Sequence, residues 1–249
     1  MRSTARLART APIVALALLV GTCAACGAAP PTLQATAPSP SRRAEELAQR
    51  TVALIATDTD PDVDPASRLR TYCSGVWVSS DSFLTASHCT RAQTLGDTIK
   101  YAVPQDVADN GVTGVRVGVL VARDDTHDLA LVRDRGAPAH SEAKIATVTV
   151  GQNVHSMGHP LGLWWSYSRG EVAAIRLRAL GEHKAMWWVQ ATAPISPGNS
   201  GGGLFDDNGD LVGIATGQMN GGQNLNLFSD PRYAKAFLAA STATRGGAK

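Results

Sequence analysis

One serine in the chain has a setting that could make it a nucleophile. Ser200 lies in "PISPGNSGGGLF", with Gly198 shortly before it and three glycines directly after it. Glycine is costly in regular structure and suits places where the backbone must turn tightly. The flanking segments "WWVQATAPI" and "DLVGIATG" have the character of buried strands, which argues against a flexible linker. A hydroxyl on such a turn can attack a carbonyl carbon if a base takes its proton.

His88 is the histidine best placed to act as that base. It ends "CSGVWVSSDSFLTASHC", which predicts two strands joined by a short turn. Cys73 and Cys89 are the only cysteines in the body of the predicted mature domain, so in an exported chain we expect them to pair. The bridge would hold the neighbouring His88 in place. The other histidines fall in loops, at turns or at a hairpin tip: His127, His140, His155, His159 and His183.

Asp128 is the acid expected to orient the histidine. It stands in "DDTHDLALVRD", directly before the apolar run "LALV". A carboxylate that enters a buried strand is expensive unless it is paired, and an imidazole N–H would pair it. Asp124 and Asp125 lie in the preceding polar loop and are expected to be solvated. The chain order is therefore His88, Asp128, Ser200, the order of chymotrypsin-type enzymes.

These segments resemble the motifs of trypsin-like serine proteases. "LTASHC" resembles the histidine motif, "HDLALV" the aspartate motif and "GNSGG" the serine motif. The resemblance covers residues 42–240. It implies an all-β fold of two packed six-stranded antiparallel β-barrels, with a catalytic triad of His88, Asp128 and Ser200. It also implies an oxyanion hole made by the backbone N–H groups of Gly198 and Ser200.

Within that family the chain is most similar to the HtrA proteases. "VQATAPISPGNSGGGLFDDNGDLVGIATG" and "SMGHPLGLWWSYSRGEVAAI" carry this similarity. Three features differ either from the pattern of trypsin or from that of the HtrA proteases. Asn199 replaces the aspartate that pairs with the freed N-terminus of trypsin. The chain ends at Lys249, with no room for a PDZ domain, and the cysteine pair belongs to the trypsin pattern. The HtrA resemblance therefore implies a protease domain for this chain, and it does not imply a PDZ domain.

The resemblance also suggests which residues contact the substrate. They surround the serine and form the strand expected to lie beside a bound peptide: Pro194, Ile195, Ala215, Thr216 and Gly217. None of them is charged, so the sequence predicts cleavage after small or aliphatic residues rather than after Lys, Arg or Glu. Thr216 also occupies the position where the family often has a serine near the aspartate.

Composition limits the other classes of function. The 249 residues are 44% apolar and carry a net charge of +2, without a basic patch that would indicate nucleic-acid binding. The acidic stretch "DTDPDVD" fails the EF-hand pattern, because Val63 and Leu69 replace the required Gly and Glu. No metal or other cofactor is predicted. The expected partners are protein or peptide substrates, and the oligomeric state stays open.

The N-terminus predicts export. Residues 1–25 combine a basic start with the short apolar run "APIVALALLV", which is typical of a signal peptide. "GTCAACG" resembles a bacterial lipoprotein signal, with Cys26 as the lipidated residue; Cys23, or ordinary cleavage with release, is the alternative. Residues 26–41 are rich in Pro, Ala, Ser and Thr and read as a disordered stalk. The predicted location is the bacterial cell envelope, membrane-anchored or secreted.

The elements that position the candidate residues fill the rest of the chain. A short helix is expected from Ser41, barrel one at about 51–137 and barrel two at about 145–229. "DPRYAKAFLAAS" predicts a closing helix with Asp230 as N-cap and Pro231 as its first residue. The rival interpretation is a catalytically silent binding module or an envelope chaperone on the same fold.

Overall fold

The structure is a computed structural model that describes residues 40–57, 69–108, 111–181 and 183–246. The predicted signal peptide at 1–25 and the acidic stretch at 58–64 lie outside these residues, as does nearly all of the predicted stalk at 26–41.

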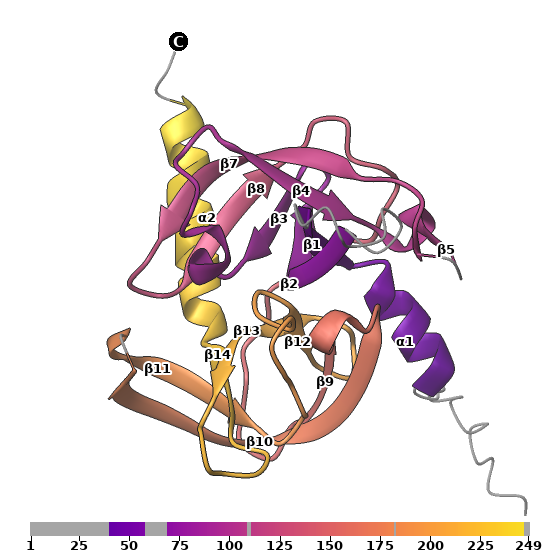
Figure 1. Ribbon diagram of the computed structural model, residues 1–249. Coiled ribbons are helices and arrows are strands. Elements are labelled where there is room, and N and C mark those ends of the chain that lie inside the picture. Colours follow the sequence, from indigo (N-terminus) through magenta and orange to yellow (C-terminus); the bar gives the residue numbers. More distant parts are fainter. Residues whose placement is uncertain (1–39, 58–68, 109–110, 182, 247–249) are drawn as a thin grey trace, which may run out of the picture. The chain divides into compact units, whose positions relative to one another are not determined.

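The first barrel is built from the N-terminal half of the described chain (indigo to magenta in Figure 1). Its six antiparallel strands close in the order β1-β2-β3-β8-β7-β4. They are β1 (Thr51–Thr57), β2 (Leu69–Ser79), β3 (Ser82–Thr85), β4 (Thr98–Ala102), β7 (Arg116–Asp124) and β8 (Leu129–Arg133). A separate two-stranded sheet, β5 (Val107–Ala108) with β6 (Gly111–Val112), follows a short 3-10 turn, η3 (Pro104–Asp106).

Aromatic side chains fill the first barrel. Trp77, Phe83 and Tyr101 have no exposed surface. The Trp77 ring centroid lies 5.2 Å from that of Phe83 and 5.8 Å from that of Tyr101, both in edge-on contact. Because aromatic rings prefer this edge-to-face arrangement, the cluster fixes how β2, β3 and β4 pack across the barrel.

The second barrel (orange in Figure 1) closes in the order β10-β11-β14-β13-β12-β9. Its strands are β9 (Asn153–Gly158), β10 (Ser166–Leu180), β11 (His183–Ala191), β12 (Gly203–Phe205), β13 (Leu211–Gln218) and β14 (Asn226–Ser229). Small side chains dominate its interior, among them Val154, Val189, Ala191 and Ala215 around Phe228. Small residues allow short strands to pack closely, so this barrel needs no aromatic cluster.

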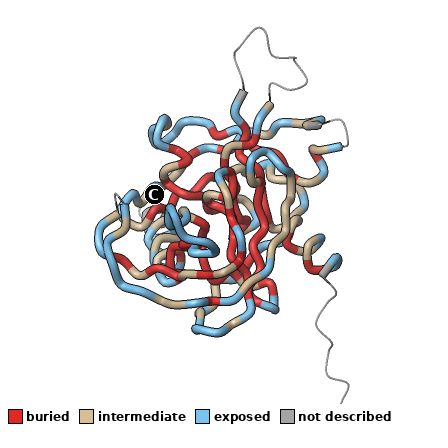
Figure 2. The backbone as a smooth tube through the Cα atoms, turned by 60° about the horizontal axis from the view of Figure 1, so that its bottom comes forward, coloured by how far each residue is buried: buried red, intermediate tan, exposed pale blue. Residues whose placement is uncertain are grey.

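A third apolar cluster joins the two barrels. It combines Val76, Leu84 and Leu129 of the first barrel with Met157, Phe205 and Ile214 of the second. Figure 2 shows that the buried residues gather in the interior of the described chain, with exposed residues around them. Burying a large aliphatic side chain contributes about 2 kcal/mol, so this shared cluster holds the barrels in one arrangement.

Both predicted helices are present, and both touch the shared cluster. α1 (Pro40–Ala48) contributes Leu47 and begins one residue before the expected Ser41. α2 begins at Pro231 and runs to Gly246. Asp230 caps it, since its Oδ1 accepts a hydrogen bond from the Arg232 amide at 3.0 Å. None of the helices in the described ranges is long and apolar enough to cross a membrane. The predicted all-β class, two six-stranded barrels with a helix at each end, is confirmed.

A disulfide joins Cys73 of β2 to Cys89 of η2 (Ser87–Thr90), the short 3-10 turn that carries His88. Both cysteines are buried against the aromatic cluster of the first barrel. The bridge therefore ties the turn that carries the histidine to the interior of the barrel.

We expect removal of this bridge to lower stability. The double variant Cys73→Ala/Cys89→Ala should lose about 3 kcal/mol of unfolding free energy, because the unfolded chain regains the entropy of an open loop. Urea unfolding of the two proteins measures the difference. Peptide mapping without reductant should recover the two cysteines as one linked pair. Two freely alkylated thiols in the wild-type protein would refute the bridge.

Candidate active site

His88 and Asp128 form a hydrogen-bonded pair. The Nδ1 atom of His88 lies 2.9 Å from Oδ2 and 3.0 Å from Oδ1 of Asp128. An ionised carboxylate can only accept hydrogen bonds, so Nδ1 carries the proton of the neutral imidazole. The other ring nitrogen, Nε2, is then left with a free lone pair, which is the form that a general base needs.

The Asp128 carboxylate is fully buried and held by several donors. Its Oδ1 accepts hydrogen bonds from the Ser87 hydroxyl at 3.1 Å and from the His88 amide at 3.0 Å. Asp128 also has a φ of 56°, in the left-handed region that few residues adopt at low cost. Burial on its own would raise the pKa of this carboxyl, but the hydrogen bonds from His88 and the charges of His88 and His183 hold the pKa below its usual range.

A tight turn precedes Ser200. The Asn199 amide donates to the Ser196 carbonyl oxygen at 3.0 Å, and Gly198 between them has a φ of +103°. Pro197 and Gly198 thus occupy the central positions of a type II turn, which favours Pro first and needs Gly second. A Cβ at Gly198 would also overlap the His159 carbonyl oxygen. These two constraints explain why the sequence has "SPGN" here.

Every carbonyl group around this turn is held in place. The Pro197 carbonyl oxygen accepts a hydrogen bond from the Leu161 amide at 2.7 Å, and that of Asn199 accepts one from the Gly202 amide at 2.8 Å. Ser74 supplies the other two donors: its hydroxyl donates to the Gly198 carbonyl oxygen at 2.8 Å and its amide to that of Ser200 at 2.7 Å. In a planar peptide the N–H points away from the C=O. The amides of Gly198 and Ser200 therefore point away from these contacts, and neither has an acceptor within the described ranges. Two such amides can bind a negatively charged oxygen.

The serine loop packs against the turn that carries the histidine. The Ser200 carbonyl oxygen lies 3.7 Å from Cys89 Sγ, one residue beyond His88. A Cβ at Gly201 would overlap the Ser74 carbonyl oxygen and the Thr85 hydroxyl, so only glycine allows this close approach. The structure thus brings the loop of Ser200 in barrel two next to the histidine turn of barrel one, although no hydrogen bond between the Ser200 hydroxyl and His88 is formed among the described residues.

The residues expected to contact substrate are arranged unevenly. Ile195 and Ala215 are 8% and 0% exposed and belong to the core of barrel two, so their side chains face the interior. Pro194 is exposed, Thr216 and Gly217 are half-buried, and a Cβ at Gly217 would meet open space.

Among the described residues, Thr216 makes no hydrogen bond to Asp128, so its expected place near the aspartate stays a prediction. Its hydroxyl donates to the Ile214 carbonyl oxygen at 3.4 Å, and the hydroxyl that contacts Asp128 belongs to Ser87. Ser87 precedes His88 in the chain, so the local turn η2 supplies this donor.

Ser74 and His159 are site neighbours that the sequence did not identify. His159 is fully buried, and its Nδ1 lies 2.8 Å from the Ser74 hydroxyl that contacts Gly198. Burial lowers the pKa of His159 to about 3, so the imidazole stays neutral at physiological pH. In the sequence this histidine is part of an ordinary turn, "HSMGHPLG", and nothing marks its partner 85 positions away.

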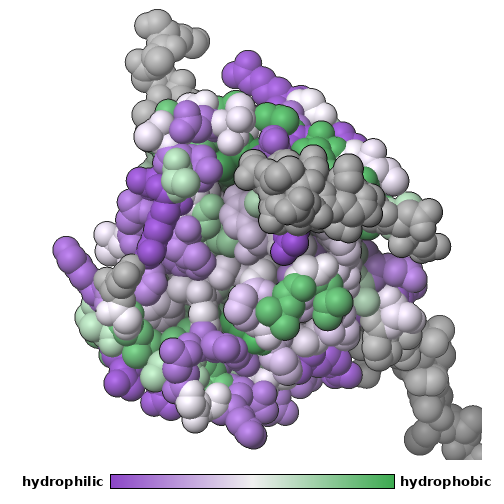
Figure 3. Space-filling view, viewed as in Figure 1, coloured by the Kyte–Doolittle hydropathy of each residue, from purple (hydrophilic) through white to green (hydrophobic). Residues whose placement is uncertain are grey.

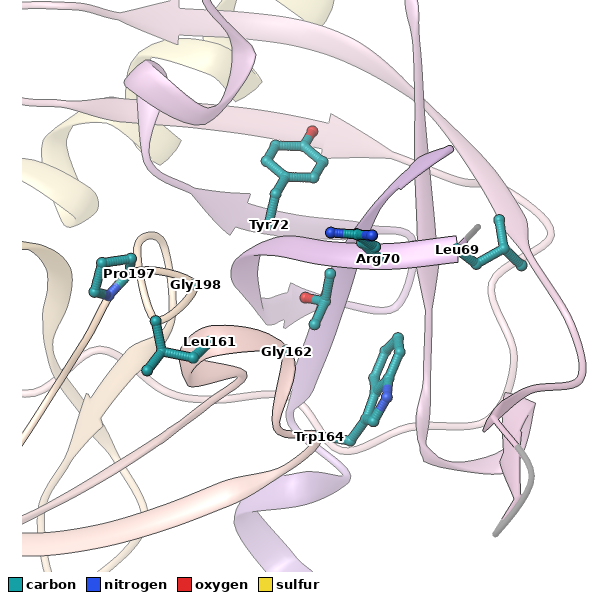
Figure 4. Close-up of a pocket in the computed structure, with 9 residues that line it drawn as sticks. Leu69, Arg70, Tyr72, Leu161, Gly162, Trp164, Pro197 and Gly198 are labelled. Carbon is teal, nitrogen blue, oxygen red and sulfur yellow. The ribbon is translucent and has the colours of Figure 1, made fainter. Parts of the chain in front are cut away.

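A cavity of about 510 Å³ opens beside the turn of Gly198. It is lined by Leu69, Arg70, Thr71, Tyr72, Leu161, Gly162, Trp164, Pro197 and Gly198. Figure 4 shows Leu161 next to Pro197 and Gly198, with Trp164 further along the cavity. Leu161 is 74% exposed, so a bound molecule in the cavity could cover much of its apolar surface. The surface of the face shown in Figure 3 is mostly hydrophilic or neutral, with a few small apolar areas.

Metal binding by the described residues has one candidate group, formed by Cys73, His88 and Cys89. The two sulfur atoms of this group are bonded to each other. A cysteine binds a metal ion as its thiolate, and a disulfide has no thiolate. The oxidised pair therefore does not offer a metal site.

Comparison with known proteins assigns the family. The model of the trypsin-like peptidase domain matches residues 73–214. Serine endoprotease DegS of Haemophilus influenzae is 34% identical over 150 residues, which are 57% of this chain and 40% of that protein. Serine protease PepD of Mycobacterium tuberculosis is 34% identical over 104 residues, 38% of this chain and 22% of that protein. The chain thus spans less than half the length of these relatives.

Solved structures agree with this assignment. The HtrA-type protease AlgW with a tripeptide has a TM-score of 0.64 and 25% identity, over 81% of this chain and 62% of that one. A serine endoprotease from Yersinia pestis has a TM-score of 0.60 and 23% identity, over 82% of this chain and 67% of that one, and supports the fold. The chain belongs to the trypsin-like peptidase family, and it is similar to serine endoproteases of the HtrA type.

Proposed function

We propose that the chain is an exported serine endopeptidase that uses His88, Asp128 and Ser200 as a catalytic triad. The observation that carries the proposal is the pairing of a buried carboxylate with His88, next to a serine turn whose two amides lack acceptors. A silent binding module would have no use for either feature. The family assignment and the relatives named as serine endoproteases support the same reaction class.

In the first half of the proposed reaction, the Ser200 hydroxyl attacks the carbonyl carbon of a peptide bond. His88 Nε2 takes the hydroxyl proton, and Asp128 stabilises the imidazolium through the Nδ1–H bond. The carbonyl oxygen becomes an oxyanion and is bound by the amides of Gly198 and Ser200, each worth about 3 kcal/mol. His88 then returns the proton to the leaving nitrogen, the C–N bond breaks, and an acyl-enzyme ester remains on Ser200.

The second half repeats these roles with water. His88 takes a proton from a water molecule as the water oxygen attacks the ester carbon. The same two amides bind the new oxyanion. The proton returns to Ser200 Oγ as the ester bond breaks, so the enzyme is regenerated and a carboxylic acid product leaves.

We propose a preference for small or aliphatic residues before the cut. The candidate contacts Pro194, Thr216 and Gly217 carry no charge. Burying an unpaired carboxylate or ammonium against them would cost several kcal/mol, whereas an extra methylene changes the binding energy much less. Discrimination against charge should therefore be strong, and discrimination among aliphatic residues weak.

The chain after the cut would meet the cavity beside Gly198. Its lining comes from β2, the Leu161 turn and Pro197, and includes no residue of β13 (Leu211–Gln218), the strand proposed to bind the segment before the cut. Leu69, Tyr72, Leu161 and Trp164 make this cavity largely apolar. An apolar side chain in the leaving segment would cover the exposed Leu161 and gain from burial.

Export is proposed from the sequence. The leader at 1–25 and the stalk at 26–41 support export to the bacterial cell envelope, with Cys26 as the point of lipidation. One curated relative is named a periplasmic endoprotease. Its reported place in the envelope is consistent with such a route.

Ser200→Ala should abolish activity. The variant lacks the nucleophile, so hydrolysis of casein should fall by at least about 10³-fold, and a fluorophosphonate probe should label the wild type once, on the peptide containing Ser200.

Asp128→Asn should lower kcat by about 10⁴-fold, because the amide favours the wrong imidazole tautomer. Circular dichroism checks the fold of both variants. A folded Ser200→Ala protein that digests casein at the wild-type rate would exclude the triad, and an unlabelled, inactive wild type that prevents aggregation would indicate a chaperone.

Cleavage of a peptide library should show the proposed side-chain preferences. Before the cut we expect Val, Ala or Leu, with Lys, Arg and Glu poor; after the cut we expect apolar residues. Leu161→Ala should weaken the second preference by several-fold, because it removes part of the cavity wall.

Leu163→Ala provides a matched control for that experiment. Leu163 is also a leucine, is 64% exposed and lies two positions further on, but it does not line the cavity. If the two variants change the library profile equally, the cavity does not bind the leaving segment. Strong cleavage after Arg would contradict the uncharged pocket.

Lipidation can be tested in cells with an alkyne fatty acid. The wild-type protein should become labelled and Cys26→Ser should not, because the acyl chain is attached at that cysteine. Persistence of the label in Cys26→Ser would move the anchor to Cys23. Absence of label from the wild type would mean that the chain is released.

A further inference from the structure

We propose that His159 is a positioning residue that acts through Ser74 to hold the Gly198 turn in its reactive form. The proposal rests on the proposed protease function and adds to it a second histidine, outside the triad. His159 does not touch the substrate in this proposal. Its effect passes through two hydrogen bonds to the glycine whose amide would bind the oxyanion.

The direction of these hydrogen bonds follows from their atoms. The Ser74 hydroxyl lies 2.8 Å from the Gly198 carbonyl oxygen and 2.8 Å from His159 Nδ1. A carbonyl oxygen only accepts, so the single hydroxyl proton of Ser74 goes to Gly198. His159 must then donate from Nδ1–H to the Ser74 oxygen. The remaining ring nitrogen, Nε2, is buried without a hydrogen-bond partner, which agrees with this proton placement.

His159 is built to remain in that state. Its ring meets the rings of Trp164 and Trp165 nearly edge-on, at centroid distances of 5.9 Å and 4.8 Å. These indoles exclude water, and burial keeps the pKa of His159 low, so the ring stays a neutral Nδ1–H donor across the physiological range. The hydroxyl of Ser74 is therefore oriented at every pH at which the protease would work.

Gly198 is a residue whose backbone needs such a restraint. Glycine has the widest range of backbone conformations, and at φ +103° it adopts one that other residues rarely use. The peptide before Gly198 is fixed by the Leu161 amide, and the peptide after it is fixed by Ser74. When both neighbouring peptides are fixed, the two dihedral angles of Gly198 are fixed with them. The Gly198 amide then keeps its direction between turnovers.

One short segment supplies most of this support. His159 contributes its side chain to Ser74 and its backbone oxygen to the contact that only glycine tolerates at 198. Leu161 follows two positions later and holds the Pro197 carbonyl oxygen at 2.7 Å. The turn after β9 thus serves as a rigid cradle for the oxyanion-binding turn.

The test compares two replacements of His159 that separate hydrogen bonding from packing. In His159→Asn the side-chain amide nitrogen stands the same number of bonds from Cβ as Nδ1, so it can still donate to Ser74. In His159→Leu the apolar volume is better preserved but the donor is lost. We expect His159→Leu to lower kcat by about 10- to 100-fold with little change in KM, since the lost contact acts in the transition state. His159→Asn should recover most of kcat.

Ser74→Ala completes a double-mutant cycle. It should lower kcat about as much as His159→Leu, and the double variant should be no worse than either single change, because both remove one relay. The pH profile of kcat/KM should keep its shape in all variants, since His88 and Asp128 are untouched. His155→Leu is the matched control: His155 is also buried and lies on β9, but it bonds to Tyr167 and Asp207, and its loss should leave kcat within about two-fold.

The outcomes separate the inference from the function on which it depends. An inactive wild type that no fluorophosphonate labels would overturn the protease proposal itself. An active wild type with a fully active His159→Leu would overturn only the relay. If His159→Asn and His159→Leu lose kcat equally, the residue acts by packing and the proposal fails. The proposal also fails if the loss of kcat follows the loss of thermal stability across the variants, His155→Leu included.

Discussion

The site depends on a contact between barrels that is made by one small residue. Ser74 of β2 donates its amide to the Ser200 carbonyl oxygen and its hydroxyl to that of Gly198. Ser200 belongs to the second barrel, whereas His88 and Asp128 belong to the first. Without a fixed connection, the two halves of the site would be set only by apolar packing, which tolerates small shifts. Two directional hydrogen bonds from one buried residue remove that tolerance.

The same region buries several polar side chains, and this burial has a cost in stability. Asp128, His159 and Asn199 are 0%, 0% and 4% exposed. His159 Nε2 and Asn199 Oδ1 lack protein partners within the described ranges, and each buried unpaired atom costs about 1–3 kcal/mol. The three apolar clusters around the site offset this cost. A neutral Asn199 also means that no buried charge has to be paired before the turn can form.

The same backbone segment around Ser200 would position the nucleophile and form the amide pair that binds the oxyanion. The glycines around Ser200 permit a turn that side chains would block, as the overlaps at Gly198 and Gly201 show. That freedom would also allow the loop to leave the reactive form. Hydrogen bonds donated by Ser74, Leu161 and Gly202 restrain the loop. The glycine-rich segment is therefore held in one conformation.

The amino-acid sequence was sufficient for the fold class, the two helices and the choice of candidate residues, because each rests on a local pattern. "DPRYAKAFLAAS" carries its own cap and apolar face, and the serine turn carries its Pro and Gly in the order that a type II turn requires. The tertiary structure was needed to identify which residues of distant segments contact each other. Ser87 rather than Thr216 meets Asp128, and His159 meets Ser74 across 85 positions. Such contacts depend on how two barrels pack, and side-chain direction and inter-barrel distance leave no trace in the local spacing of residue types.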